Sequence, residues 1–332
     1  MAVLMAAGMA RAAQPIQTKQ DVLAWMNAYD PKRDFARAPS VMKKASNIGV
    51  LSDPEAAGMY VGFMAGMIAS RPEKADATVQ KLLVIRPADY WAIVRAIAYS
   101  GHPDWPGLMT RFAPKMPTRE LMAQRYLDGK LPTPATRVTE EKTSWSDRFN
   151  PANWFSGKDK EKQVALDERP EMLDVYWGYY FATRGSWPLE RMIRMLPWAD
   201  ERDNVEKLTI GSMAKYTLAM NASRDTRVLG FLKGLRVQQT DEKTLKQLSE
   251  TIEAAETAET SELRRTALAR MEDLKRLGPG NKRDMALWGK IGQGVISLGC
   301  VAAAATGQAA LGLPCVIGGA ASSAALYYLT SP

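Results

Sequence analysis

The chain has very few of the side chains that most often carry chemistry, with one histidine and two cysteines in 332 residues. The lone His102 excludes metal sites that need two or more histidines, and its place between Gly101 and Pro103 is typical of a turn residue. Both cysteines, Cys300 and Cys315, lie close to the C-terminus. A domain built on disulfides is therefore excluded, and Cys–His catalysis is implausible.

Motifs for nucleotide binding and nucleophilic catalysis are also missing. No glycine-rich loop has Walker or dinucleotide-binding spacing, and no serine lies in a nucleophile-elbow sequence. Carboxylates such as Asp174, Asp200 and Asp203 could form an acid–base pair in space, as in glycoside hydrolysis, but nothing in the sequence brings two of them together. The sequence predicts no catalytic residue, no cofactor and no metal, and a carboxylate-dependent enzyme stays an alternative.

The chain lacks long runs of one charge, although its net charge is +8 and its pI is about 9.3. A basic balance fits an anionic partner such as a membrane surface or a nucleic acid. The best local clusters, Arg264-Arg265 and Lys282-Arg283, are too small for a nucleic-acid site. We therefore expect solvated charged faces, with no nucleic-acid partner and no evident small-molecule ligand.

Helix-forming residues dominate what is present. Met and Ala are abundant while Val, Ile and Thr are sparse, which favours helices over sheets. We predict an all-α fold, a helical bundle or a short α-solenoid of antiparallel helix pairs, with a C-terminal apolar helical hairpin. Thr18 to Asp21 has capping-box spacing, and Ser52-Asp-Pro-Glu55 has the pattern of a helix start. Further helices are expected at 75–85, 88–100, 118–127, 171–183, 189–196, 205–222 and 227–235.

Glycine recurs every four residues within the apolar segment 56–70, at Gly58, Gly62 and Gly66. This spacing forms a groove on one helix face and lets another backbone approach closely. One interpretation is a membrane helix-dimer motif. The apolar run is shorter than the roughly 20 residues that a span requires, so tight packing inside a soluble bundle is favoured.

The remaining patterns divide the chain. Residues 241–277 are polar with one narrow apolar seam, typical of a helix packed along a neighbour or of a short coiled coil. The predicted organisation is a signal-peptide remnant at 1–13, an N-terminal helical region at 14–130, a linker or long surface loop at 131–169, a C-terminal helical region at 170–280 and an apolar hairpin at 281–332.

The segment 131–169 is rich in proline and mixed charge, yet it contains Trp145, Phe149, Trp154 and Phe155. These aromatics are candidate contacts with a membrane or with a protein partner. The alternative is a loop that its own aromatics hold against the body.

The first residues resemble the end of a secretory signal. An apolar run is followed by Ala10-Arg11-Ala12, which has the small-x-small pattern of a cleavage site. The basic region that normally precedes such a run is missing here. Export is one interpretation, and an alanine-rich first helix is the other.

Residues 291–332 contain no charged side chain. A turn near Thr306-Gly307-Gln308 would give a hairpin whose arms are at or below the length of a full span. We expect membrane association through 291–330, with a hairpin buried in the core as the alternative. The basic flank at 282–290 would be cytoplasmic by the positive-inside rule, which conflicts with export. The candidate contacts in this tail are Gly299, Gly307, Gly312, Gly318, Gly319, Tyr327 and Tyr328.

Two stretches carry a loose family resemblance. The first is Leu51-Ser-Asp-Pro through Gly62-Phe63, with Arg71-Pro72 and 96–101, and the second is Asp174-Val-Tyr-Trp177 through Phe181-Ala-Thr-Arg-Gly185, with Asn221-Ala222. Together they cover about half of the chain and resemble a family of uncharacterised proteobacterial proteins. Arg184 departs from the Ala-Thr-Gly expected there. The resemblance implies an all-helical, exported bacterial protein and brings no activity or site residues.

These patterns favour a non-catalytic helical protein of the bacterial envelope, associated with a membrane and acting as an interaction or scaffold module for a protein partner. The predicted location is the inner membrane or the periplasm, and a cytoplasmic location stays open. A second hypothesis is a membrane-active or secreted protein whose hairpin inserts into a target bilayer.

Overall fold

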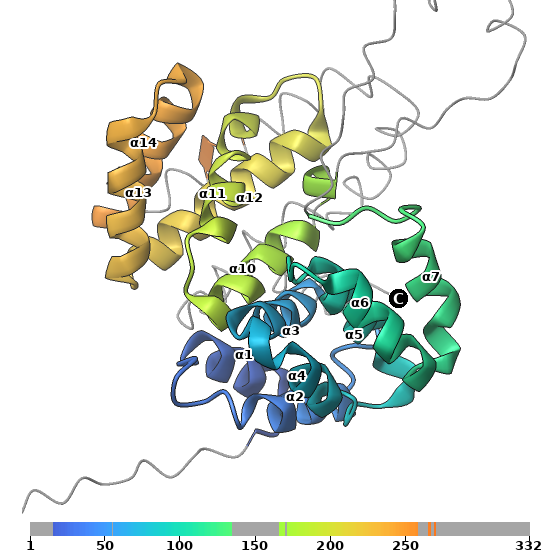
Figure 1. Cartoon of the computed structure of the whole chain (residues 1–332). Coiled ribbons are helices and arrows are strands. Elements are labelled where there is room, and N and C mark those ends of the chain that lie inside the picture. The colour runs from blue at the N-terminus through green and yellow to red at the C-terminus, as the bar shows by residue number, and fades with distance from the viewer. Residues whose placement is uncertain are drawn as a thin grey trace, which may run out of the picture.

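The computed structural model describes residues 16–54, 56–134, 166–169, 171–257, 265–266 and 269. Within these residues the chain is helical and contains no strand (Figure 1). The predicted all-α fold is therefore confirmed, and its helices form tightly packed pairs. The apolar hairpin predicted at 281–332 lies outside the described residues, and the predicted division into regions stays a prediction.

Proline and short 3-10 turns separate most of the helices. The elements are α1 (Lys19–Asn27), α2 (Ala38–Asn47), α3 (Gly58–Ser70), η1 (Pro72–Lys74), α4 (Ala75–Leu82), η2 (Pro87–Asp89), α5 (Tyr90–Tyr99), α6 (Trp105–Phe112), η3 (Ala113–Lys115), η4 (Pro117–Arg119), α7 (Glu120–Leu127), η5 (Leu166–Glu168), α10 (Glu171–Thr183), α11 (Trp187–Ile193), η6 (Leu196–Asp200), α12 (Val205–Ala222), α13 (Thr226–Gln238) and α14 (Glu242–Glu256). The sequence patterns do not predict α2 and α6, whose first turns contain Pro39 and Pro106.

The two predicted helix starts have different outcomes. Thr18 caps α1 through the backbone N–H of Asp21, and the Asp21 carboxylate accepts from the Thr18 N–H, so the predicted capping box is confirmed. The start predicted at Ser52 is wrong, because α3 begins at Gly58 after an Ala57 cap that has no side-chain hydrogen bond. The Ser52 hydroxyl instead accepts a hydrogen bond from Arg86.

Helices α3 and α10 are in backbone contact at the centre of the molecule (Figure 1). A Cβ atom added to Gly62 would lie 1.9 Å from the carbonyl oxygen of Val175, and one added to Gly178 would lie 2.0 Å from that of Met59. Any side chain at these positions would force the two helices apart. Gly58 and Gly66 lie on the same face of α3, against residues of α10.

The α3–α10 pair is parallel. Gly58 faces Glu171, Gly62 faces Val175 and Gly66 faces Tyr179, so the residue numbers rise together along both helices. Chain neighbours joined by short links pack antiparallel, but the segments that form this pair are far apart in the sequence. The contact therefore joins the N-terminal and C-terminal parts of the described chain.

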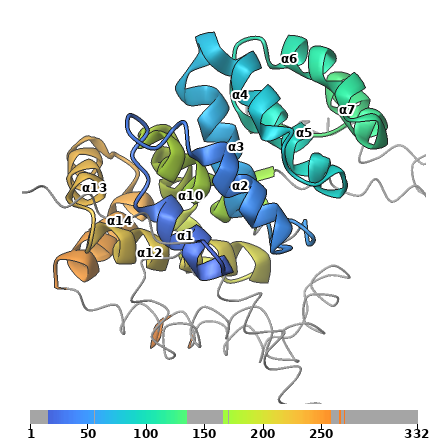
Figure 2. The same ribbon diagram turned by 90° about the horizontal axis from the view of Figure 1, so that it is seen from below.

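The long polar helix α14 lies beside α13 at the end of the molecule opposite α7 (Figures 1 and 2). Its predicted apolar seam is buried at Leu248, Ile252 and Ala255. The helix ends at Glu256, and the rest of the predicted seam lies outside the described residues. Among the described helices, none combines the length and the apolar character needed to cross a bilayer.

Arg184 ends α10 and ties it to α1. Its φ of 55° lies in the left-handed region, where glycine is favoured. The guanidinium donates to the carbonyl oxygens of Asn27 and Tyr29 at the end of α1, and it lies over the Tyr180 and Phe181 rings. These contacts offset the backbone strain of a non-glycine residue with positive φ.

Asp174 lies in the α3–α10 contact and is fully buried. Neither carboxylate oxygen has a hydrogen-bond partner among the described residues. Burial raises the pKa of Asp174 well above its ordinary value, opposed by the nearby Lys19 ammonium and reinforced by Glu171. Burial therefore favours the neutral, protonated form of Asp174 inside the core.

Gly62→Ala tests the backbone contact. The added methyl group meets backbone atoms that cannot move independently, so the free energy of unfolding should fall by about 3 kcal/mol or more. Gly230→Ala on α13 is the matched control, because a Cβ there meets nothing within 4 Å and the change should stabilise the chain by about 0.5–1 kcal/mol. Urea denaturation followed by circular dichroism measures both, and similar effects at the two positions would contradict the close contact.

Asp174→Asn tests the buried neutral acid. A carboxyl whose pKa is raised by folding contributes stability that is fully present below its unfolded pKa of about 3.9 and is lost as pH rises through its folded pKa. The melting temperature of the Asn variant relative to the native chain should therefore shift upward between about pH 4 and about pH 8. A difference that stays constant or shifts downward over this range would show an ionised Asp174.

Candidate functional site

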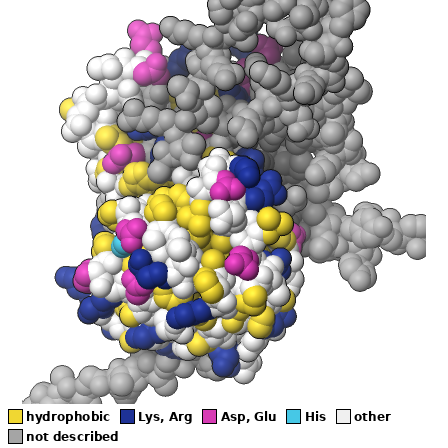
Figure 3. Space-filling model, turned by 45° about the vertical axis from the view of Figure 1, so that its right-hand side comes forward, with side chains coloured by type: hydrophobic (Ala, Val, Ile, Leu, Met, Phe, Trp, Pro, Cys, Tyr) yellow, Lys and Arg dark blue, Asp and Glu magenta, His cyan; other side chains and the backbone are white. Residues whose placement is uncertain are grey.

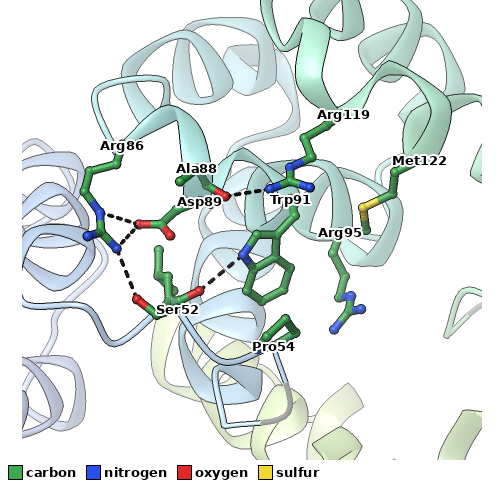
Figure 4. A pocket seen from close by; sticks show the side chains of 10 residues that line it. Ser52, Pro54, Arg86, Ala88, Asp89, Trp91, Arg95, Arg119 and Met122 are labelled. Carbon is green, nitrogen blue, oxygen red and sulfur yellow. Dashed lines mark hydrogen bonds and ion pairs between the residues drawn. The ribbon is translucent and has the colours of Figure 1, made fainter.

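A pocket with a volume of about 470 Å³ lies between three segments of the N-terminal half (Figure 4). The loop after α2 supplies Ser52. Arg86 directly precedes η2, Asp89 ends it and Arg95 lies on α5, while η4 supplies Arg119. The arginine pocket, as we call it, is completed by apolar residues: Leu51, Pro54, Ala88, Trp91 and Met122. This volume lies within the usual range of small-ligand sites, roughly 300–1,000 Å³.

The loop that forms one wall is fixed at both ends. Gly49 has a φ of +82° and ends α2 by donating its N–H to the Ser46 carbonyl oxygen at 3.0 Å. The indole N–H of Trp91 donates to the Leu51 carbonyl oxygen at 3.2 Å, which holds the loop against α5. The wall is therefore held by backbone geometry as well as by packing.

Asp89 and Arg86 line one side of the pocket. The buried Asp89 carboxylate accepts from the Ser46 hydroxyl at 2.6 Å and from Arg86 Nε at 2.9 Å. The other arm of Arg86 reaches the Ser52 hydroxyl at 3.3 Å (Figure 4). Arg86 is thus neutralised and held in place by residues of the α2 and α5 segments.

The other two arginines have fewer partners. Arg119 donates from Nη2 to the Ala88 carbonyl oxygen at 2.9 Å, and Arg95 lies 5.1 Å from the centre of the Trp91 ring (Figure 4). The Nε atoms of Arg95 and Arg119 are buried and have no hydrogen-bond partner among the described residues. Neither guanidinium has an ion pair with a carboxylate in the described part of the chain. The charges of Arg95 and Arg119 are therefore not balanced by a carboxylate among the described residues.

The surface on the α7 side of the molecule is partly apolar. Leu121, next to the lining residue Met122 on α7, is 77% exposed. Figure 3 brings the α7 side of the molecule forward and shows apolar side chains between basic and acidic ones on this face.

None of the candidate site residues that the sequence analysis names lines the arginine pocket. Gly58, Gly62 and Gly66 lie in the α3–α10 contact, far inside the core. The other candidates all lie outside the described residues: Trp145, Phe149, Trp154, Phe155, Gly299, Gly307, Gly312, Gly318, Gly319, Tyr327 and Tyr328. The leader at 1–13 lies outside them too.

The candidate acid–base residues have different surroundings. Asp174 is buried in the core, whereas Asp200 accepts a hydrogen bond from Gln247 and lies 3.8 Å from the Lys246 ammonium. His102 uses both ring nitrogens locally, accepting from the Asp104 N–H and contacting the Pro72 carbonyl oxygen. Within the described residues, no group of three or more His, Cys, Asp or Glu side chains could hold a metal.

Sequence patterns gave no signal for the arginine pocket. Arg86 precedes η2, Arg95 lies on α5 and Arg119 lies in η4, and the three form no charge cluster in the sequence. Only the folding of α5 against the η4–α7 segment brings them together. Comparison with protein-family models, with curated proteins and with solved structures finds no match to this chain. What the pocket binds is therefore inferred from its own residues.

Proposed function

We propose that this chain is a non-catalytic helical binding module whose arginine pocket takes an anionic group of its partner. The observation that carries this proposal is the surplus of guanidinium groups. Three arginines and one carboxylate line the pocket, and two buried guanidinium nitrogens have no partner among the described residues. An anion that enters the pocket would be favoured by this surplus of positive charge and would accept charge-assisted hydrogen bonds from guanidinium groups.

The lining residues favour binding over acid–base chemistry. Arginine stays protonated across the physiological range, so it orients and stabilises an anion without exchanging a proton. The Asp89 carboxylate already accepts hydrogen bonds from Ser46 and Arg86. The pocket therefore supports the interaction or scaffold role that the composition favours.

Thermal denaturation with added anions tests the pocket. A ligand that binds only the folded chain stabilises it by about 2.7 kcal/mol at a concentration one hundred times its dissociation constant. We expect benzoate and phosphate to raise the melting temperature, and neutral benzyl alcohol at matched ionic strength to have no effect.

Arg95→Gln and Arg119→Gln should each remove most of this stabilisation. Arg125→Gln on α7 is the matched control, because Arg125 is exposed and does not line the pocket. Equal anion stabilisation in all three variants would show non-specific screening and contradict the proposal.

We also propose that residues 291–330 attach this module to a membrane. The support is the absence of charge from 291 to the C-terminus, together with the basic flank that precedes it. The full chain should sediment with lipid vesicles, and a chain ending at Gly280 should stay in the supernatant. A full chain found wholly in the supernatant would remove the attachment. Dye leakage that requires the tail would favour the alternative in which the hairpin inserts into a target bilayer.

A further inference from the structure

Helices α2 and α4 lie side by side and run in the same direction. Near their starts, Arg71 donates to the Pro31 carbonyl oxygen at 3.2 Å and lies 4.2 Å from the centre of the Phe35 ring. Near their ends, the Ser46 hydroxyl in the last turn of α2 accepts from the Arg86 N–H, just after α4, at 3.0 Å. The starts of the two helices are therefore close to each other, and so are their ends.

The outer side of this helix pair is basic. Lys43 and Lys44 on α2 and Lys81 on α4 are exposed, and none of them has an ion pair with a carboxylate of the described residues. Helix α2 contains no acidic residue. Asp76, the acidic residue of α4, pairs with Arg111 of α6 at 2.7 Å. The charges of the three lysines are therefore not neutralised within the described part of the pair.

Two apolar side chains are exposed where the same helices end. Ile48 directly follows α2 and is 38% exposed, and Val84 follows α4 and is 46% exposed. The hydrogen bond between Ser46 and Arg86 joins the two segments that carry them. Figure 1 places α2 and α4 in the lower part of the body, where Figure 3 shows basic and apolar side chains together. The basic face, as we call it, consists of Lys43, Lys44, Ile48, Lys81 and Val84.

A bilayer that contains anionic lipids accommodates both kinds of side chain. Lysine ammonium groups can lie at the level of the lipid phosphates while apolar side chains enter the boundary of the acyl chains. A nucleic acid would contact the lysines and leave Ile48 and Val84 in water. The apolar pair therefore favours a lipid surface over a nucleic acid.

We propose that the basic face docks on an anionic lipid bilayer, with its three lysines at the level of the phosphates and its two apolar side chains in the interface. This inference goes beyond the attachment by residues 291–330, because it places a second contact on the described body. Each lysine close to such a surface raises the partition coefficient about fivefold. The face adds to the contribution of the tail and orients the body on the membrane.

Sedimentation of the full chain with two kinds of vesicle tests the basic face. Phosphatidylcholine vesicles carry no net charge and measure the contribution of the tail, whereas vesicles that also contain phosphatidylglycerol measure both contacts. The partition coefficient should rise with phosphatidylglycerol. Lys43→Gln, Lys44→Gln and Lys81→Gln together should lower it about tenfold or more on the anionic vesicles. Salt at about 1 M, where charges are screened beyond about 3 Å, should have a similar effect.

Three exposed basic residues elsewhere provide the matched control. Arg125→Gln, Arg236→Gln and Lys243→Gln together remove the same charge from α7, α13 and α14, and this variant should keep the preference for phosphatidylglycerol. Ile48→Ser with Val84→Ser should weaken binding to the anionic vesicles about threefold or more, because apolar surface no longer leaves water. Thermal denaturation shows that all three variants fold.

The outcomes separate the basic face from the tail. Equal losses in the lysine variant and in the control would show attraction by net charge alone and overturn the face. Equal binding to both kinds of vesicle would overturn the face and leave the tail attachment standing. Binding to neither would overturn both. Binding only to anionic vesicles, lost in the lysine variant, would overturn the tail attachment and support the face.

An oligothymidylate distinguishes a nucleic acid from a lipid surface. The chain should bind it no more tightly than the lysine variant does. Oligothymidylate binding that requires the three lysines and is unchanged by Ile48→Ser with Val84→Ser would assign the face to a nucleic acid and overturn the proposal.

Discussion

The backbone contact between α3 and α10 is the constraint on which the rest of the described structure depends. Gly62 and Gly178 let two parallel helices approach until the carbonyl oxygens of Val175 and Met59 occupy the space of the missing side chains. Helix α5 packs on α3, and α1 and α11 pack on α10, so the positions of both halves follow from this one contact. Trp177 extends it to α12 through a hydrogen bond to Thr217.

The same contact explains two unfavourable features of the core. Asp174 lies where α10 meets Gly58, and its burial without a partner among the described residues is a local cost that the surrounding packing must offset. Arg184 adopts a left-handed backbone at the end of α10 and binds two carbonyl oxygens at the end of α1. Both residues show that the central pair is stable enough to carry local strain.

The arginine pocket does not touch the α3–α10 contact and depends on it only through α5. It is built on α5, which packs on α3, and on a loop that Gly49 turns and Trp91 holds. Its donors are therefore placed by well-packed elements, which lowers the entropic cost of binding a ligand.

The sequence by itself determined the helical class, the cap at Thr18, most helix positions and the close-packing role of the α3 glycines, because these depend on residues near one another in the chain. It did not predict α2 and α6, and it placed the start of α3 too early, because Ser52 bonds to Arg86 rather than to its own helix. Only the tertiary structure decided that α3 pairs with α10 in parallel and that Arg86, Arg95 and Arg119 share one pocket. Both arrangements join residues that are distant in sequence, and no local spacing or propensity encodes such a contact.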